Sequence, residues 1–283
     1  MPSARTRLVV KTAVLTLLVA AGLAAAAGYT VFRAGWYNIG STSQHLQPVY
    51  SLLEQGMRHS VRHYASEVAV PRLDAPGQVL RGGALYGEHC VQCHGGPGAA
   101  PAPHGMSMQP VPGPLVDASA RWRPRELYWI TRHGIKMSGM PAWEARLSEA
   151  DTWAVVAFVT RMPGLDARAF HEMTAAPPER EQALAQPAAA TRGDPVRGKR
   201  VLPQYACHSC HLVPGITGSE AYVGRPLDGL ARRSLIAGTL PNTQDNLVRW
   251  IRSPQAIDPR TAMPAMGVSE RDALDISAYL LSR

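Results

Sequence analysis

The chain has 283 residues, of which 46% are hydrophobic and 18% charged, with 24 Pro, 25 Gly and a net charge of +8. This length suits two domains of ordinary size, and the apolar content excludes an intrinsically disordered chain. The positive charge is spread along the sequence, and no segment is basic enough to indicate a nucleic acid as partner.

The N-terminal segment predicts a membrane anchor. An uncharged apolar run from Thr12 to Phe32 follows three basic residues, and its 21 residues would span about 30 Å as a helix. We therefore expect residues 1–33 to form a cytoplasmic stub and a single-pass helix in a bacterial inner membrane, with everything after it in the periplasm. A cleaved signal peptide is the alternative, because Ala24–Ala26 offers a cleavage site, and it would export the same residues.

Residues 34–76 predict a membrane-proximal helical segment. Tyr50, Leu53, Met57 and Val61 recur at three- and four-residue spacing, which is typical of an amphipathic helix. Such a helix would lie between the membrane and the first domain or pack on that domain.

The rest of the chain repeats one order of parts in residues 77–162 and 193–283, which predicts two tandem domains. Residues 163–192, with 9 Ala and 4 Pro, separate them as a linker or a surface strap. Each half opens with an amphipathic helix that runs into a cysteine motif, continues through a Pro-Leu loop and a Trp-bearing helix, and ends with Met-Pro and a closing helix. The opening helices are expected at Gly77–Cys93 and Asp194–Cys210, the Trp-bearing helices near Leu127–Ile130 and Leu247–Ile251, and the closing helices at Leu147–Val159 and Val268–Leu280.

The closing helices match most closely. Ser148 and Ser269 are 121 residues apart, and three further pairs of identical residues in these helices have the same separation. These serines are expected to cap the helices. Neither half has a long alternating pattern of the kind that predicts strands, so the predicted fold class is all-α.

All four cysteines fall in two Cys-x-x-Cys-His motifs, Cys90-Val-Gln-Cys93-His94 and Cys207-His-Ser-Cys210-His211. On a helical turn, residues three apart share a face and the next residue lies beside them. Two thiols so placed can add to the two vinyl groups of one haem, and the imidazole can ligate its iron. The motifs therefore predict two covalently bound haem c groups.

Other uses of four cysteines fit less well. Two disulfides would leave the histidine after each motif unexplained. Zinc is disfavoured because adjacent Cys and His cannot easily occupy two tetrahedral corners, and thioredoxin-like exchange lacks its βαβ pattern.

The distal ligand of each iron is predicted to be a methionine, because a soft thioether favours ferrous iron. Met140-Pro141 and Met263-Pro264 follow the histidine of their motifs by 46 and 52 residues, each just before the closing helix. Met140 and Met263 are thus the predicted ligands, with Met137 and Met266 as rivals. Further candidates in the first half are Met106, Met108, His104 and His133.

The proximal histidines are expected to donate their other ring nitrogen to a backbone carbonyl, which fixes the tautomer. Pro114 and Pro226 are the expected acceptors.

Both halves resemble class I c-type cytochrome domains. The first is similar to the haem domains of cytochrome subunits of membrane-bound dehydrogenases through Gly83–Tyr86 before its cysteine motif and through Gly134–Trp143. The second resembles cytochrome domains that accompany terminal oxidases, through Ala237–Asn242 and Thr261–Pro264. The resemblance implies thioether bonds at Cys90, Cys93, Cys207 and Cys210, proximal ligands at His94 and His211, and distal ligands at Met140 and Met263.

These residues predict an electron carrier and not an enzyme. A dehydrogenase or a quinol-oxidising complex would be the donor, and a terminal oxidase or a soluble cytochrome the acceptor. The chain would act either as a tethered shuttle or as a fixed subunit of a respiratory complex. The alternative function is a dihaem peroxidase in which one distal ligand, Met140, is labile.

Overall fold

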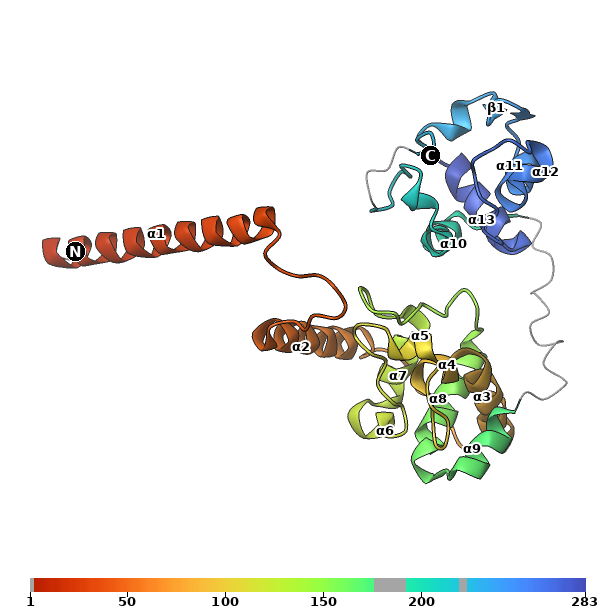
Figure 1. Cartoon of the computed structure of the whole chain (residues 1–283), viewed down its shortest axis with the longest axis horizontal. Helices are drawn as coiled ribbons and strands as arrows, with labels where there is room; N and C mark the ends of the chain where they lie inside the picture. Colours follow the sequence, from red (N-terminus) through yellow and green to blue (C-terminus); the bar gives the residue numbers. More distant parts are fainter. Residues whose placement is uncertain (1–2, 176–191, 219–222) are drawn as a thin grey trace. The chain divides into compact units, whose positions relative to one another are not determined.

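The computed structural model describes residues 3–175, 192–218 and 223–283, and it divides the chain into two compact units, Met1–Ala176 and Pro177–Arg283 (Figure 1). The described residues of both units are mainly helical, as the sequence predicts.

Helix α1 covers Ala4–Ala34 and contains the predicted apolar run. The Ser3 side chain caps its first turn by accepting from the Thr6 N–H, and Gly35 ends it with a φ of 67°. Its most apolar 18-residue window has a mean hydropathy of 2.2. By length and composition, α1 can cross a membrane.

The described residues of the first unit continue through nine further helical elements, among which α7 and α8 correspond to predicted helices. The Trp-bearing helix is α7, and the closing helix is α8, whose N-terminus is capped as predicted because the Ser148 hydroxyl accepts from the Asp151 N–H at 3.1 Å. The elements are α2 (Gln47–Tyr64), α3 (Pro76–His89), α4 (Val91–His94), α5 (Pro103–Met106), α6 (Ala118–Arg121), α7 (Pro124–His133), α8 (Glu149–Arg161), the 3₁₀ turn η1 (Met162–Gly164) and α9 (Ala167–Thr174).

The core of this unit lies where α3 crosses α8 (Figure 1). Gly82 makes the crossing possible, because a Cβ atom there would lie 1.9 Å from the Ala154 carbonyl oxygen. Beside the crossing, the fully buried ring of Tyr86 contacts Phe158 and Phe170, with ring centroids 5.3 and 5.9 Å apart. The opening helix is therefore fixed by the last helices of the unit.

Helix α9 differs from the linker expected at residues 163–192. Its Phe170 side chain is only 2% exposed, and Gly83 of α3 lies so close that an added Cβ would be 2.5 Å from the Met173 carbonyl oxygen. Residues 163–192 contain few large apolar side chains, and this average composition predicts a linker although Phe170 anchors the first part of the segment. The rest of the predicted linker, residues 176–191, lies outside the described residues.

An ion pair joins α3 and α8 at the edge of the core. The Arg81 Nε donates to Asp151 Oδ1 at 2.5 Å, and the Ser148 hydroxyl donates to Asp151 Oδ2 at 2.7 Å. Burial acts to raise the pKa of Asp151, but these hydrogen bonds and the charge of Arg81 outweigh it and lower the pKa below its ordinary 3.8.

We expect this pair to make the first unit acid-sensitive. A lowered folded-state pKa stabilises the unit above about pH 4, and the stabilisation is lost as the pH falls through that lowered pKa. Asp151→Asn should therefore destabilise the unit at pH 7, and its difference from wild type should shrink in acid. Hydrogen exchange of the α8 amides measures the destabilisation at pH 7 and its decrease in acid. The exposed pair Arg168–Glu172 provides the control, since Glu172→Gln should leave exchange unchanged at either pH. A difference for Asp151→Asn that is independent of pH would contradict the assignment.

The second unit has a similar framework. Helix α10 crosses α13 at Gly198, where a Cβ atom would lie 2.0 Å from the Asp275 carbonyl oxygen. Arg197 pairs with Asp272 at 2.7 Å and also with the fully buried Asp275. The elements are α10 (Pro195–Val201), the 3₁₀ turns η3 (Leu202–Tyr205), η4 (Cys207–Ser209) and η5 (Leu230–Arg232), the strands β1 (Leu235–Ile236) and β2 (Leu240–Pro241), and the helices α11 (Gln244–Arg252), α12 (Pro254–Ile257) and α13 (Glu270–Leu281).

Helices α11 and α13 correspond to the predicted Trp-bearing and closing helices, and the Ser269 hydroxyl caps α13 by accepting from the Asp272 N–H at 3.1 Å. The short strands β1 and β2 pair antiparallel, and Ala237 and Gly238 turn between them with φ values of 50° and 76°.

Candidate haem sites

The first cysteine motif lies on the helical turn that the sequence predicts. Helix α3 ends at its cap residue Cys90, and α4 follows at once. The His94 N–H donates to the Cys90 carbonyl at 2.9 Å, so the turn is a regular one. The side chains of Cys90, Cys93 and His94 thus come from one turn, and none of the four cysteines is in a disulfide bond.

The second motif keeps its own turn but not the predicted helix before it. Helix α10 stops at Val201, a 3₁₀ turn follows, and Ala206 adopts a left-handed φ of 52° before the motif begins. Pro203 explains the break, because it has no N–H to donate and its ring crowds the preceding turn. Within the motif, the His211 N–H donates to the Cys207 carbonyl at 3.0 Å, as its counterpart does in the first.

The histidine of each motif uses Nδ1 to bond a backbone carbonyl. The distance is 2.8 Å from His94 to Gly113 and 2.7 Å from His211 to Arg225. With Nδ1 donating, the lone pair of Nε2 is available to a metal ion, which is the arrangement that a haem iron needs.

The expected acceptors, Pro114 and Pro226, were wrong by one residue in each unit. Proline holds the residue before it in an extended conformation, which directs that residue's carbonyl. The proline carbonyls themselves are occupied by arginines: Arg121 Nη2 donates to Pro114 at 3.2 Å, and Arg233 Nη2 donates to Pro226 at 2.5 Å.

These arginines were missed at the sequence level, although a signal was present. Each follows its proline by seven residues, so Pro-x₆-Arg recurs in both halves. The order of histidine, carbonyl acceptor, proline and arginine is a second repeat, built around the ring that would ligate iron.

Burial sets the protonation of the first motif. It lowers the pKa of His94, against the hydrogen bond to Gly113, and the imidazole therefore stays neutral and can ligate a metal. Burial also raises the pKa of Cys90 to about 12 and that of Cys207 above its usual range.

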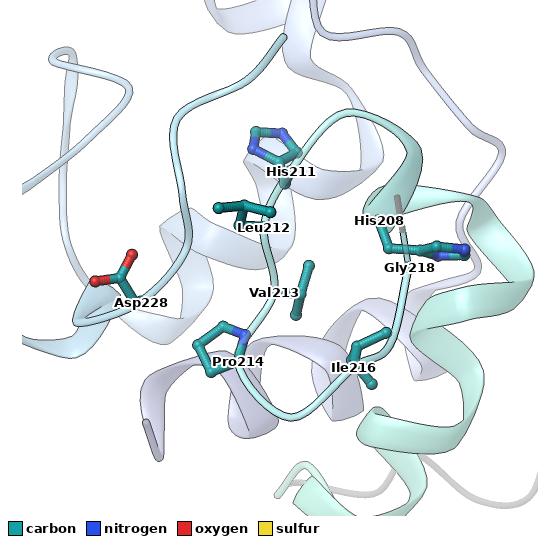
Figure 2. Close-up of a pocket in the computed structure, with 8 residues that line it drawn as sticks. All are labelled: His208, His211, Leu212, Val213, Pro214, Ile216, Gly218 and Asp228. Carbon is teal, nitrogen blue, oxygen red and sulfur yellow. The ribbon is translucent and has the colours of Figure 1, made fainter. Parts of the chain in front are cut away.

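A pocket in the second unit brings apolar side chains to the imidazole of His211 (Figure 2). Leu212, Val213 and Ile216 line it, with Asp228 at its edge. The chain also passes directly over the ring at Gly224, where a Cβ atom would lie 2.2 Å from the imidazole Cε1. Only glycine fits there, so the loop after the motif helps to orient the histidine.

The loop that carries Met140 is closed on itself after α7. Gly134 starts it with a φ of 66°, and a Cβ there would lie 2.7 Å from the Met140 carbonyl oxygen. The Ile135 N–H donates to that carbonyl at 3.2 Å, and the Met140 N–H donates to the Ser138 hydroxyl at 3.2 Å. Met140 is half-buried in this loop, whereas its rival Met137 is 99% exposed.

A second thioether lies beside the same loop. The Met108 Sδ is 2.6 Å from the position that a Cβ on Gly139 would take. Met106, by contrast, is 53% exposed. The structure therefore places Met108 against the loop that carries Met140 and leaves Met106 and Met137 exposed.

Met263 is held in a comparable loop between α12 and α13. Gln255 Nε2 donates to the Met263 carbonyl at 2.6 Å, and the Met263 N–H donates to the Thr261 hydroxyl at 3.3 Å. Met263 is half-buried, and its rival Met266 is 42% exposed.

Comparison with known proteins agrees with these features for the first unit. A family model described as cytochrome c oxidase, cbb3-type, subunit III matches residues 77–159. A cytochrome c oxidase subunit 2 from Alkalihalophilus pseudofirmus is 39% identical over 87 residues, which is 30% of this chain and 25% of that protein, so the chain spans about a quarter of this relative's length. No solved structure matches the chain. Residues 77–159 are therefore similar to a c-type cytochrome domain, a kind of domain that holds covalently bound haem c and transfers electrons.

Proposed function

We propose that this chain is a membrane-anchored electron carrier with two haem c groups, one in each unit. The observation that supports a second haem is the hydrogen bond from His211 Nδ1 to the Arg225 carbonyl, which repeats the hydrogen bond from His94 Nδ1 to the Gly113 carbonyl. A satisfied surface histidine needs no such fixed tautomer, whereas a metal ligand does. The units would correspond to tandem domains at 77–162 and 193–283, with α9 added to the first.

The proposed attachment residues are the four cysteines, with His94 and His211 as proximal ligands and Met140 and Met263 as distal ligands. Haem iron held by an imidazole and a thioether exchanges one electron without changing its ligands. The protein's part is to hold these side chains still. The carbonyl bonds fix the histidine rings, and the closed loops with their Met-Pro sequence restrict the methionines.

In this proposal α1 remains as a single-pass anchor in a bacterial inner membrane, and both units lie in the periplasm. The basic residues before its apolar run and the oxidase subunit among the similar proteins support this placement. A dehydrogenase or quinol-oxidising complex would supply electrons, and a terminal oxidase or soluble cytochrome would accept them. Anchoring keeps the carrier at high effective concentration near such partners.

The haem count tests the proposal directly. We expect the intact mass of the purified wild type, measured under denaturing conditions, to include two haems. Cys90→Ala/Cys93→Ala and Cys207→Ala/Cys210→Ala should each retain one. A proteolytic map of the wild type needs no variant to fold and should find haem on both cysteine peptides. Haem on the first peptide alone would refute the second site, and an unmodified chain would refute both.

A further inference from the structure

A group of outward-facing apolar side chains lies in the segment between α1 and α2 and in the first turns of α2. Trp36 is 72% exposed, Ile39 92%, Leu46 67%, Leu52 73% and Leu53 58%. Large apolar residues this exposed and this close in sequence typically mark a surface that something else covers.

The segment before α2 is folded so that its polar groups bond one another. The Tyr37 hydroxyl and His45 Nδ1 lie 2.5 Å apart, and their rings stack at 6.0 Å. The Gly40 N–H donates to the Asn38 side chain at 2.8 Å. These bonded groups are themselves exposed, and beside them the loop also exposes the large apolar side chains of Trp36 and Ile39.

The unit itself does not need these residues, because it holds α2 by its other end. Val61 is 1% exposed, the Tyr64 ring stacks on Trp129 at 5.9 Å, and the Arg58 guanidinium lies 5.6 Å from the Trp122 ring. Arg125 Nη1 donates to the Ser66 carbonyl at 2.8 Å just beyond the helix. The docked half of α2 is thus fixed, and the exposed leucines belong to the half that precedes it.

We propose that residues 36–53 lie in the headgroup boundary of the membrane that α1 enters. This rests on the proposed role of α1 as a retained anchor. Only residues 35–46 separate the last residue of α1 from the first of α2, so the exposed group is tethered at the membrane surface. Trp and Tyr favour that boundary, and an amphipathic helix with exposed leucines binds there by burying its apolar side.

The charge of α2 fits the same occupant. Arg58 of this helix pairs with Glu54 at 2.9 Å, and the exposed Arg62 adds a positive charge that suits anionic headgroups. Because the C-terminal half of α2 is packed on the first unit, boundary contact by residues 36–53 would hold that unit at the bilayer surface and limit its rotation.

The test uses the full-length protein with haem attached, in nanodiscs that contain an anionic phospholipid with a diazirine near its headgroup. Light-induced labels are then mapped by mass spectrometry. We expect labels on residues 36–53 in the wild type and at least a roughly fivefold loss in Leu52→Asp/Leu53→Asp. Leu80→Asp is the matched control, since Leu80 is a 55% exposed leucine on α3, and it should leave the labelling unchanged.

The outcomes separate this inference from the function on which it rests. A phospholipid with its diazirine deeper in the bilayer labels α1. If α1 is labelled and residues 36–53 are not, the boundary contact is refuted and the anchor stands. If neither is labelled, the anchor itself fails. Crosslinks from residues 36–53 to another protein in native membranes, without lipid labels there, would show that a partner covers this face and would overturn the proposal.

Discussion

Replacing Met140 by histidine is expected to lower the reduction potential of one haem by roughly 0.1–0.3 V and to leave the other unchanged. A thioether is a soft ligand that favours ferrous iron, and an imidazole donates more strongly and favours the ferric state. Spectroelectrochemical titration of the wild type and variant measures the shift. In Cys207→Ala/Cys210→Ala, which leaves one haem, the shift can be assigned to the first unit.

The control for this prediction is Met137→His. Met137 is three residues away in the same loop, but its side chain is 99% exposed at a φ of 57°, so its replacement should not move either potential. An unchanged potential in Met140→His would remove Met140 from the ligand set. Met108, which packs beside the same loop, would then be the next variant to titrate.

Replacing Gly82 by leucine is expected to unfold the first unit and spare the second. The new Cβ would lie 1.9 Å from the Ala154 carbonyl oxygen and 2.5 Å from its carbon. Backbone atoms cannot move aside as a flexible side chain can, so the helices must separate, at a cost above about 4 kcal/mol. Hydrogen exchange should show α8 unprotected while α13 keeps its wild-type protection.

Gly198→Leu should leave α13 unprotected while α8 keeps its wild-type protection, because a Cβ at Gly198 would lie 2.0 Å from the Asp275 carbonyl oxygen. Gly77→Leu is the control for size and helix propensity, since a Cβ at Gly77, in the first turn of α3, meets nothing within 4 Å. Loss of protection in both units from either single variant would show that they do not fold independently, and would count against tandem domains.

Local rules made much of the fold predictable from the sequence. The closing helices start at Ser148 and Ser269 because a serine hydroxyl satisfies an unpaired N–H in the first turn, which depends only on neighbouring residues. The cysteine motifs were equally clear, since three reactive side chains on one turn require only a helical turn.

Features that depend on distant contacts could not be predicted from these patterns. The roles of Gly82 and Gly198 depend on carbonyls of helices more than 70 residues further along the chain. The acceptors of the histidines were displaced by one residue because Arg121 and Arg233 occupy the proline carbonyls. The end of α10 before the second motif is different, because Pro203 disfavours a continuous helix there and is visible in the sequence.

The crossings of α3 with α8 and of α10 with α13 would also set an order of events during biogenesis. Arg81 and Asp151 are 70 residues apart, and Arg197 and Asp275 are 78 apart. If the residues after α1 cross the membrane in chain order, as proposed, each cysteine motif emerges well before its closing helix. The thiols would then be accessible for the proposed haem attachment during that interval, and arrival of the closing helix would end it. The first unit would be completed while the second is still being exported.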